Sequence, residues 1–311
     1  MFRALFFGTP AFAVPCLDAL ARVAQVVGVV CQPDKPQGRG LTLAPPPVKV
    51  RAAELGIGVV QPTKLKTGEF GAWVRAQNTD VALVVAYGRI LPPDVLAAPR
   101  LGCVNVHASL LPKYRGAAPI TWAIVRGERE TGITLMQMDA GMDTGDMLEQ
   151  VTTPIGEDET GGELSERLAR IGAELVLRGL PKFVEGGYAP IKQDGAAATL
   201  APILKKDDGK VRFDQPARAV HAHARGMTPW PGAFVRHRDK TLKIVATHVA
   251  SVSRAATPGT VILADKTGVL VACAEGAIEL VRVQPEGKKP MRGADWVMGR
   301  GVAEGDVLGG D

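Results

Sequence analysis

Residues 81–86 read VALVVA, an uninterrupted apolar run between Asp80 and the turn residue Gly88. A strand with one face in water alternates apolar and polar residues, whereas a strand covered on both faces is apolar throughout. Such strands occur mostly in parallel sheets with helices on both faces. The run therefore predicts the centre of an α/β domain and constrains how the neighbouring segments can fold.

Strand and helix patterns alternate around this run. Helical spacing of apolar residues follows a first short strand that ends in Gly8-Thr9-Pro10. The order predicts a doubly wound α/β fold with a mostly parallel sheet. The predicted strands are 4–7, 26–31, 59–60, 81–86, 102–106, 133–138 and 147–152, and the predicted helices are 12–23, 48–55, 70–76, 117–125 and 161–186.

After the last of these helices the pattern changes. Small residues and proline dominate 188–204, which is typical of a linker, and short strands with turn signals follow. Such strands predict a small OB-like β-barrel. We expect a catalytic domain at 1–188, a linker at 189–207 and a barrel at 208–311. The predicted barrel elements are strands 210–213, 232–236, 241–250, 259–263, 269–272 and 278–283, a helix at 216–225, and a rigid PWPG bend at 229–232 with Trp230 packed in it.

The positive charge of the chain is concentrated in its last third. The net charge is +5, from 37 basic and 32 acidic residues. Residues 1–204 hold 20 of each sign, whereas residues 205–311 hold 17 basic and 12 acidic residues. A basic domain joined to a neutral one suggests a polyanionic partner, nucleic acid first, and the alternative is a basic surface without a partner.

Several classes of protein are excluded by what the 311 residues lack. The four cysteines form no CxxC pair, which argues against zinc and redox motifs and for free thiols in a reducing cytoplasm. No window of 18 uncharged apolar residues predicts a membrane span, and Gly8 and Pro10 break the N-terminal apolar run, which we interpret as a strand and not an export signal. The first turn reads GTPAF instead of GxGxxG, so no dinucleotide fingerprint is present.

The candidate chemistry lies at the end of the strand that precedes NVHASLLPKYRGAAP, residues 105–119. Asn105 and His107 are two apart, so they project to the same side of a strand. Ligands of open α/β sheets bind at the carboxyl ends of strands. An amide and an imidazole there could stabilise an oxyanion and move a proton while the substrate supplies the nucleophile. The alternative is a structural histidine.

A second stretch, GITLMQMDAGMDTGD at 132–146, carries Asp139, Asp143 and Asp146. One of these carboxylates could orient His107, but all three could also be turn formers. A divalent metal site is a third alternative, although the D-x-D-x-D-G spacing is absent. The residues by themselves leave this choice open.

These two stretches resemble the folate-dependent formyltransferases. Matching motifs extend over almost the whole chain: FFGTPAFAVPCL near the N-terminus, QPDKPQGRG at 32–40, VVAYGRILP at 84–92, PWPGAF at 229–234 and PEGKKPM at 285–291. The resemblance implies a Rossmann-like formyltransferase domain and a C-terminal barrel that helps to hold tRNA. It implies 10-formyltetrahydrofolate as co-substrate, no metal, and the α-amino group of methionine on initiator tRNA as acceptor.

The resemblance also assigns residues. It implies Asn105, His107 and Asp143 as catalytic residues, Asp143 because it is the first residue of DTGD. Folate-binding residues are implied in two segments, SLLP and the stretch near 84–92, namely Ser109, Leu110, Leu111, Pro112, Tyr87, Gly88 and Ile90.

A long insertion, residues 32–49, follows the second predicted strand, and the resemblance implies that it enters the acceptor end of tRNA. It holds Lys35 and Arg39, and the glycines beside Arg39 would let the backbone approach RNA. The alternative is a mobile surface loop. In the C-terminal part the candidate phosphate contacts, each of which could also be solvated surface, are Lys205, Lys206, Arg212, Lys243, Lys288 and Lys289.

Three rival functions stay open. The acceptor could be a small molecule such as an amino sugar nucleotide or glycinamide ribonucleotide, or it could be water, or the chain could be a noncatalytic RNA-binding protein. The basic last third argues against a small acceptor, and the intact Asn105, His107 and Asp143 set argues against a noncatalytic protein. We expect a cytoplasmic monomer.

Overall fold

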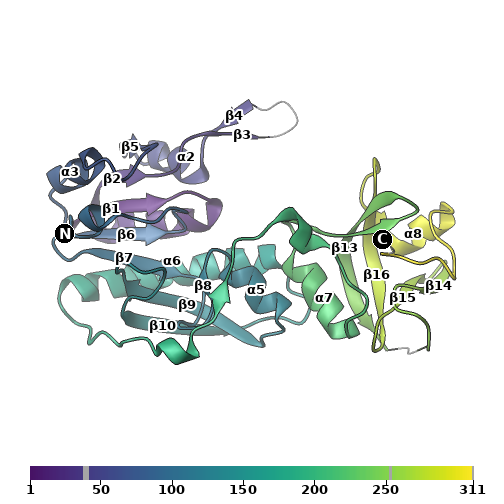
Figure 1. The fold of residues 1–311 in the computed structure, drawn as a ribbon. Coiled ribbons are helices and arrows are strands. Elements are labelled where there is room, and N and C mark those ends of the chain that lie inside the picture. The colour runs from purple at the N-terminus through teal and green to yellow at the C-terminus, as the bar shows by residue number, and fades with distance from the viewer. Residues whose placement is uncertain (38–41, 252–253, 310–311) are drawn as a thin grey trace. The chain divides into compact units, whose positions relative to one another are not determined.

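The computed structural model describes residues 1–37, 42–251 and 254–309 (Figure 1). The chain forms two compact units. The first comprises Met1–Pro119, Thr131–Thr153 and Ser165–Pro202, and the second comprises Ile120–Glu130, Pro154–Leu164 and Ile203–Asp311. None of the helices formed by the described residues is long and apolar enough to cross a membrane.

A seven-stranded sheet forms the centre of the first unit, in the order β10-β9-β7-β6-β1-β2-β5. Five neighbouring strands are parallel, whereas β9 runs antiparallel to β7. All five residues of β6 are buried, as the apolar run predicts. The strands are β1 (Phe2–Gly8), β2 (Ala24–Val30), β5 (Val59–Val60), β6 (Val81–Val85), β7 (Cys103–His107), β9 (Glu130–Gln137) and β10 (Met147–Pro154).

The helices of this part confirm the alternation of strand and helix. Apolar side chains of α1, among them Leu17 and Leu20, are buried, and Phe70 of α3 packs with Phe7 of β1 in the core. The helices of the first unit are α1 (Val14–Val23), α2 (Pro47–Glu54), α3 (Glu69–Ala76), α4 (Pro93–Leu96) and most of α6 (Gly161–Val184), which enters this unit at Ser165. Helix α5 (Pro119–Val125) belongs from Ile120 on to the second unit.

The insertion after β2 contains a short hairpin that the sequence patterns did not predict. Strands β3 (Lys35–Gln37) and β4 (Thr42–Ala44) pair antiparallel, and the hairpin projects from the first unit in Figure 1. An ion pair of 2.8 Å between Lys49 Nζ and Asp34 Oδ2 fastens its base. The Gln61 amide donates to the same carboxylate at 2.7 Å. The base of the insertion is therefore anchored to the unit.

The segment predicted as a linker packs against the first unit as far as Pro202. Its strand β11 (Leu200–Ala201) pairs in parallel with β8 (Arg115–Gly116). A second pairing joins Ile191 and Met147, whose backbone N–H groups each donate to the other's carbonyl at 2.8 Å. The segment is extended because its backbone groups are used in these intersegment bonds. The domain limits drawn from the sequence stay a prediction.

The second unit is built on antiparallel strands, as expected for the C-terminal domain. Their order is β12-β13-β16-β15-β14, with β17 paired to β16. The strands are β12 (Ala233–His237), β13 (Lys240–Ala250), β14 (Val261–Asp265), β15 (Gly268–Ala272), β16 (Ala277–Pro285) and β17 (Met291–Arg292), and the helices are α7 (Ala217–Gly226) and α8 (Gly293–Met298).

Two local predictions for this unit are wrong. Residues 210–213 form no strand; only Lys210 makes a single bridge, to Phe234. Val211 and Phe213 alternate with exposed neighbours because both side chains enter the core, which imitates a strand pattern. Trp230 is not packed in the PWPG bend but is 58% exposed, and the bend is closed by a backbone bond from Gly232 to Met227.

A buried histidine joins α7 to two other segments of the second unit. The His221 Nδ1 atom lies 2.8 Å from Thr247 Oγ1, and Nε2 lies 3.1 Å from the Glu157 carbonyl. Burial lowers the pKa of His221 below its ordinary value. Asp158, 3.2 Å from Nε2, acts in the opposite direction but more weakly.

We predict that acid destabilises the protein in part through His221. Its pKa is lower in the folded state, so the unfolded chain takes up the proton first, and the free energy of unfolding falls as the pH drops below about 6.5. His221→Gln should flatten the dependence between about pH 5 and 7, measured by urea unfolding. An unchanged pH slope in His221→Gln would contradict the assignment.

Candidate active site

The end of β7 presents Asn105 and His107 on one face of the sheet, as predicted. The strand is held on both sides, because Asn105 pairs with Val84 of β6 and with Met136 of β9. Asn105 is 9% exposed and His107 is 6% exposed. Both residues therefore stand on a strand that is paired on each side, and both are buried or nearly so.

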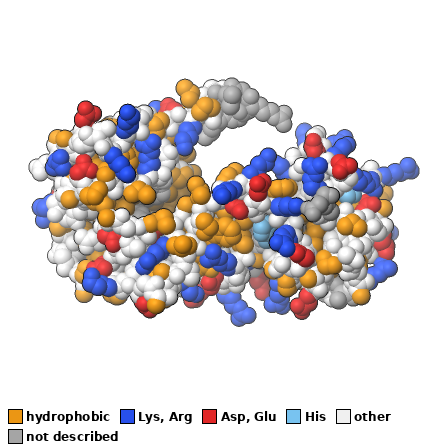
Figure 2. All heavy atoms as spheres, viewed as in Figure 1, with side chains coloured by type: hydrophobic (Ala, Val, Ile, Leu, Met, Phe, Trp, Pro, Cys, Tyr) orange, Lys and Arg blue, Asp and Glu red, His pale blue; other side chains and the backbone are white. Residues whose placement is uncertain are grey.

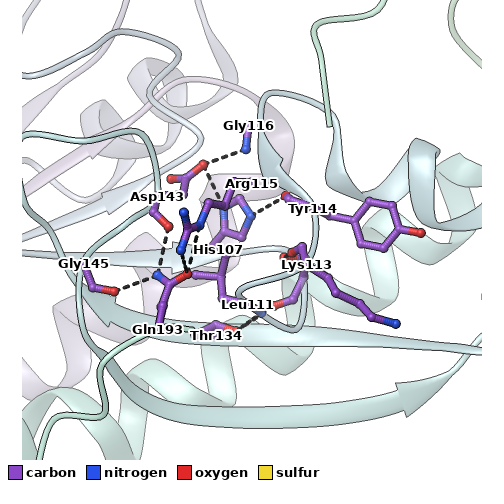
Figure 3. A network of polar contacts seen from close by, with 11 residues as sticks. His107, Leu111, Lys113, Tyr114, Arg115, Gly116, Thr134, Asp143, Gly145 and Gln193 are labelled. Atoms are coloured by element: carbon purple, nitrogen blue, oxygen red, sulfur yellow. Dashed lines mark hydrogen bonds and ion pairs between the residues drawn. The ribbon is translucent and has the colours of Figure 1, made fainter. Parts of the chain in front are cut away.

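The His107 ring lies between two acceptors (Figure 3). Its Nε2 atom is 3.0 Å from the Tyr114 carbonyl, and a carbonyl only accepts, so Nε2 carries a proton in this contact. Its Nδ1 atom is 3.7 Å from Asp143 Oδ2. A charged imidazolium could donate toward both neighbours, and the carboxylate would balance its charge.

Asp143 reaches His107 because its loop folds back. Since β9 is antiparallel to β7, the end of β9 at Gln137 lies beside Val104, and the loop must return to bring Asp143 to His107. Asp143 adopts a left-handed backbone with φ of 55°, and its Oδ2 accepts from the Gly116 N–H at 2.8 Å. The Asp143 carboxylate is therefore positioned both by its own backbone conformation and by the hydrogen bond from Gly116.

The other two acids of this loop do not face His107. Asp139 Oδ1 accepts from the Gly141 N–H at 3.0 Å and from Thr144 Oγ1 at 2.6 Å, so it forms the turn. Asp146 lies 3.6 Å from Lys192 Nζ. Within the described residues no group of three or more His, Cys, Asp or Glu could hold a metal ion.

The SLLP segment is fixed by buried polar contacts. Ser109 donates to the Lys113 carbonyl at 2.6 Å. The Thr134 hydroxyl donates to the Ser109 carbonyl at 2.6 Å and accepts from the Leu111 N–H at 3.2 Å. The Gln150 amide donates to the Leu111 carbonyl and to the Thr134 hydroxyl, both at 2.9 Å. Leu110 and Pro112 are half-buried.

The loop after β6 lies at the same sheet edge, because β6 and β7 are parallel neighbours. The Tyr87 side chain packs edge-on against Phe7 in the core, and the Tyr87 carbonyl accepts from Thr9 Oγ1 at 3.0 Å. Gly88 has a φ of 78°, and Ile90 is 75% exposed. This loop can offer a ligand its main chain and the Ile90 side chain, but not the Tyr87 ring.

The basic residues proposed from the sequence are exposed wherever the structure describes them. Lys35 lies on β3, Lys205 and Lys206 stand at a short 3-10 helix, and Lys288 and Lys289 lie in the turn after β16. Arg39 lies outside the described residues. Basic and acidic side chains are interspersed over the visible face of both units (Figure 2).

Gln193, Arg115 and Thr199 belong to the site, and sequence reasoning missed them. The Gln193 amide donates to the Asp143 carbonyl at 2.9 Å and to the Gly145 carbonyl at 2.7 Å. Its oxygen accepts from Arg115 Nε at 3.0 Å and Nη2 at 2.8 Å. Gln193 stands in a stretch of small residues typical of a linker, which gave no signal of a site.

Two family models match the chain. The formyl transferase model covers residues 2–180, and the model of the formyl transferase C-terminal domain covers residues 203–301. The chain belongs to the formyl transferase family. A methionyl-tRNA formyltransferase of Sorangium cellulosum is 59% identical over 309 residues, 99% of this chain and 99% of that protein.

Solved structures of an N-formyltransferase and of a tetrahydrofolate-bound protein share the fold. An N-formyltransferase from Helicobacter canadensis, in complex with folinic acid and dTDP-3-aminofucose, has a TM-score of 0.68 at 18% identity and covers 90% of this chain and 98% of its own. HypX from Aquifex aeolicus, in complex with tetrahydrofolic acid, has a TM-score of 0.62 at 17% identity, covering 94% of this chain and 46% of its own. The predicted Rossmann-like sheet followed by antiparallel strands is confirmed in this formyl transferase.

We predict that Thr134→Val loosens the SLLP segment. The change leaves a buried N–H and a buried carbonyl without their partner, which typically costs about 1–3 kcal/mol of unfolding free energy. Urea unfolding measures the loss. Thr131→Val, also buried on β9 but outside this network, is the matched control. Equal stability of Thr134→Val and the wild type would contradict the role of the hydroxyl.

Proposed function

We propose that this protein transfers the formyl group of 10-formyltetrahydrofolate to the α-amino group of methionyl initiator tRNA. The observation that carries the proposal is the identity of 59%, over practically the full length of both chains, with a methionyl-tRNA formyltransferase. The grouping of Asn105, His107 and Asp143 supports it, because these groups serve a reaction in which the substrate brings its own nucleophile.

The proposed reaction is a direct transfer. The free amine attacks the formyl carbon, a new C–N bond forms, and the bond between the formyl carbon and N10 of the folate breaks. Negative charge develops on the formyl oxygen. The Asn105 amide and a protonated His107 would stabilise that charge, and Asp143 would hold His107 in place. The proton lost by the amine goes to the folate nitrogen with the help of the Asp143–His107 pair.

The folate would lie at the edge where β6 and β7 end. A pterin needs hydrogen-bond partners along its edge, and the chain from Tyr87 to Ile90 can offer main-chain groups there. The exposed Ile90 side chain suits the apolar face of the rings. The SLLP segment, held by Thr134, would form the neighbouring wall through Ser109, Leu110, Leu111 and Pro112.

The tRNA would be held by cations that contact phosphates. Lys35 and Arg39 would reach its acceptor end from the insertion, and the C-terminal lysines Lys205, Lys206, Lys288 and Lys289 would contact its backbone. The excess of positive charge in residues 205–311 supports this arrangement. We also propose a cytoplasmic monomer, for which light scattering at working concentrations should give the mass of one chain.

An acceptor panel tests the function. The purified protein is incubated with 10-formyltetrahydrofolate and, in separate reactions, with methionyl initiator tRNA, uncharged tRNA, an amino sugar nucleotide or water alone. Formylation with the charged tRNA only is the expected result. Release of formate without an acceptor would favour a hydrolase, and transfer to the sugar would favour a small-molecule enzyme.

We predict that Asn105→Ala, His107→Ala and Asp143→Ala each reduce turnover by at least about 100- to 1000-fold, the loss of roughly 2.7–4 kcal/mol that removal of one oxyanion donor causes. Asn105 and His107 would be the donors, and Asp143 would act by holding His107 in place. Single-turnover formylation measures the loss, and thermal unfolding verifies the fold. Asp146→Ala, in the same loop but away from His107, is the control. Turnover of Asp143→Ala near the wild-type rate would overturn its assignment.

We predict that Arg39→Ala weakens activity on charged tRNA far more than folate binding. Loss of one phosphate contact should lower the slope of log affinity against log salt by about 1. Filter binding of tRNA at several salt concentrations measures the effect on tRNA affinity, and fluorescence titration with folate measures the effect on folate binding. The exposed Arg22→Ala serves as control. An equal effect on both ligands would argue against a tRNA-specific role.

A further inference from the structure

The segment 191–201, here named the strap, crosses the two loops that flank His107. We propose that the strap is the positioning element of the active site, with Gln193 and Thr199 as its two positioning residues. The proposal rests on the proposed function, because it concerns the chemistry of His107. It assigns a catalytic consequence to a segment that the sequence marks only as a linker.

Both acceptors around His107 belong to residues with an unfavourable backbone. Asp143 has a φ of 55° and Tyr114 a φ of 62°, which side-chain-bearing residues seldom adopt. Such conformations persist only where surrounding contacts hold them, and they cluster at functional sites. The strap contacts both of these residues and can therefore hold their backbones in place.

Gln193 holds the Asp143 side of the ring. Its two N–H groups donate to the carbonyls of Asp143 and Gly145, and its oxygen accepts twice from the Arg115 guanidinium (Figure 3). The amide thus uses both donors and its acceptor, which no other side chain of this length could do. A carboxylate at this position could still accept from Arg115 but could not donate to the loop.

Thr199 holds the Tyr114 side. Its hydroxyl accepts from the Tyr114 N–H at 2.9 Å, and its carbonyl accepts from the Arg115 N–H at 2.9 Å. These two bonds fix the peptide units on either side of the Tyr114 α-carbon, including the one whose carbonyl faces His107. The strap therefore orients the acceptor of Nε2 as well as the acceptor near Nδ1.

The strap also positions Gly116, whose backbone N–H donates to the Asp143 carboxylate. Strand β11 pairs with β8, and the Ala117 N–H donates to the Ala201 carbonyl at 2.9 Å. Gly116 has a φ of 122°, and a Cβ there would lie 2.6 Å from the Ala201 oxygen. The close approach of the strap thus requires glycine at 116, whose N–H donates to Asp143 Oδ2.

Turnover of designed variants tests the proposal. Gln193→Glu keeps the bonds from Arg115 but loses both donors, and Thr199→Val loses the hydroxyl that Thr199→Ser retains. We expect Gln193→Glu and Thr199→Val to lower kcat about 10- to 100-fold, the scale of a misplacement near 1 Å, with each KM within about twofold of wild type. Thr199→Ser should restore kcat. Gln77→Glu, a glutamine away from the site whose amide bonds Trp73, is the matched control.

A double-mutant cycle separates positioning from general damage. If Gln193 acts through Asp143, Gln193→Glu should cause no further loss in an Asp143→Ala background. Losses that add in full would overturn the proposal, as would wild-type kcat in both Gln193→Glu and Thr199→Val. If Gln193→Glu does not fold, the comparison of Thr199→Val with Thr199→Ser decides in the same way.

The ring of His107 provides a readout that needs no activity. With ¹⁵N-labelled histidine, and the His107→Ala variant to assign the signals, Gln193→Glu should shift the Nδ1 resonance and Thr199→Val the Nε2 resonance. Unchanged signals in both variants would overturn the positioning role. If the wild type formylates none of the acceptors, the proposed function fails, while these shifts still report whether the strap sets the surroundings of His107.

Discussion

An imidazole ring held between a backbone carbonyl and a carboxylate is the contact on which the first unit depends. The carbonyl comes from the loop after β7, and the carboxylate comes from the loop after β9. Because β9 runs against β7, these loops leave the sheet at opposite ends. The fold must therefore bring one of them back across the sheet. The hydrogen bonds from Gly116 and Gln193 hold the returning loop at Asp143.

The parallel core was the easiest part to predict. Continuous apolar residues predict the strand at 81–86 and its neighbours, because helices cover both faces of the sheet. Strand geometry alone placed Asn105 and His107 on the same side of a strand, but it left open whether the histidine is catalytic or structural. Strand geometry did not select Asp143 among the three acids, because Asp143 reaches His107 through a loop that folds back. Only the family resemblance selects Asp143 from the sequence.

The remainder escaped prediction for physical reasons. The strap is stabilised by backbone bonds to distant loops, and such pairings leave no trace in local composition. Gln193 is an isolated amide whose partners, Arg115, Asp143 and Gly145, lie in two distant loops of the chain. At 210–213 the sequence pattern predicted a strand that does not form. Two core side chains, Val211 and Phe213, alternate there with exposed residues as in a strand. Trp230 was expected to pack in the PWPG bend, yet the residue is 58% exposed.

The discontinuity of the two units limits how the gene could be divided. A cut between Pro202 and Ile203 would separate the second unit from residues 120–130 and 154–164, which belong to its compact body. Trp122 and Val125 pack against its core, and the Arg225 guanidinium donates to the carbonyls of Gly156 and Glu159. A C-terminal fragment starting at 203 would lack Trp122, Val125 and the two carbonyls to which Arg225 donates. A single break at this position therefore does not divide the chain into its two compact units, although the matching family models follow one another along the chain.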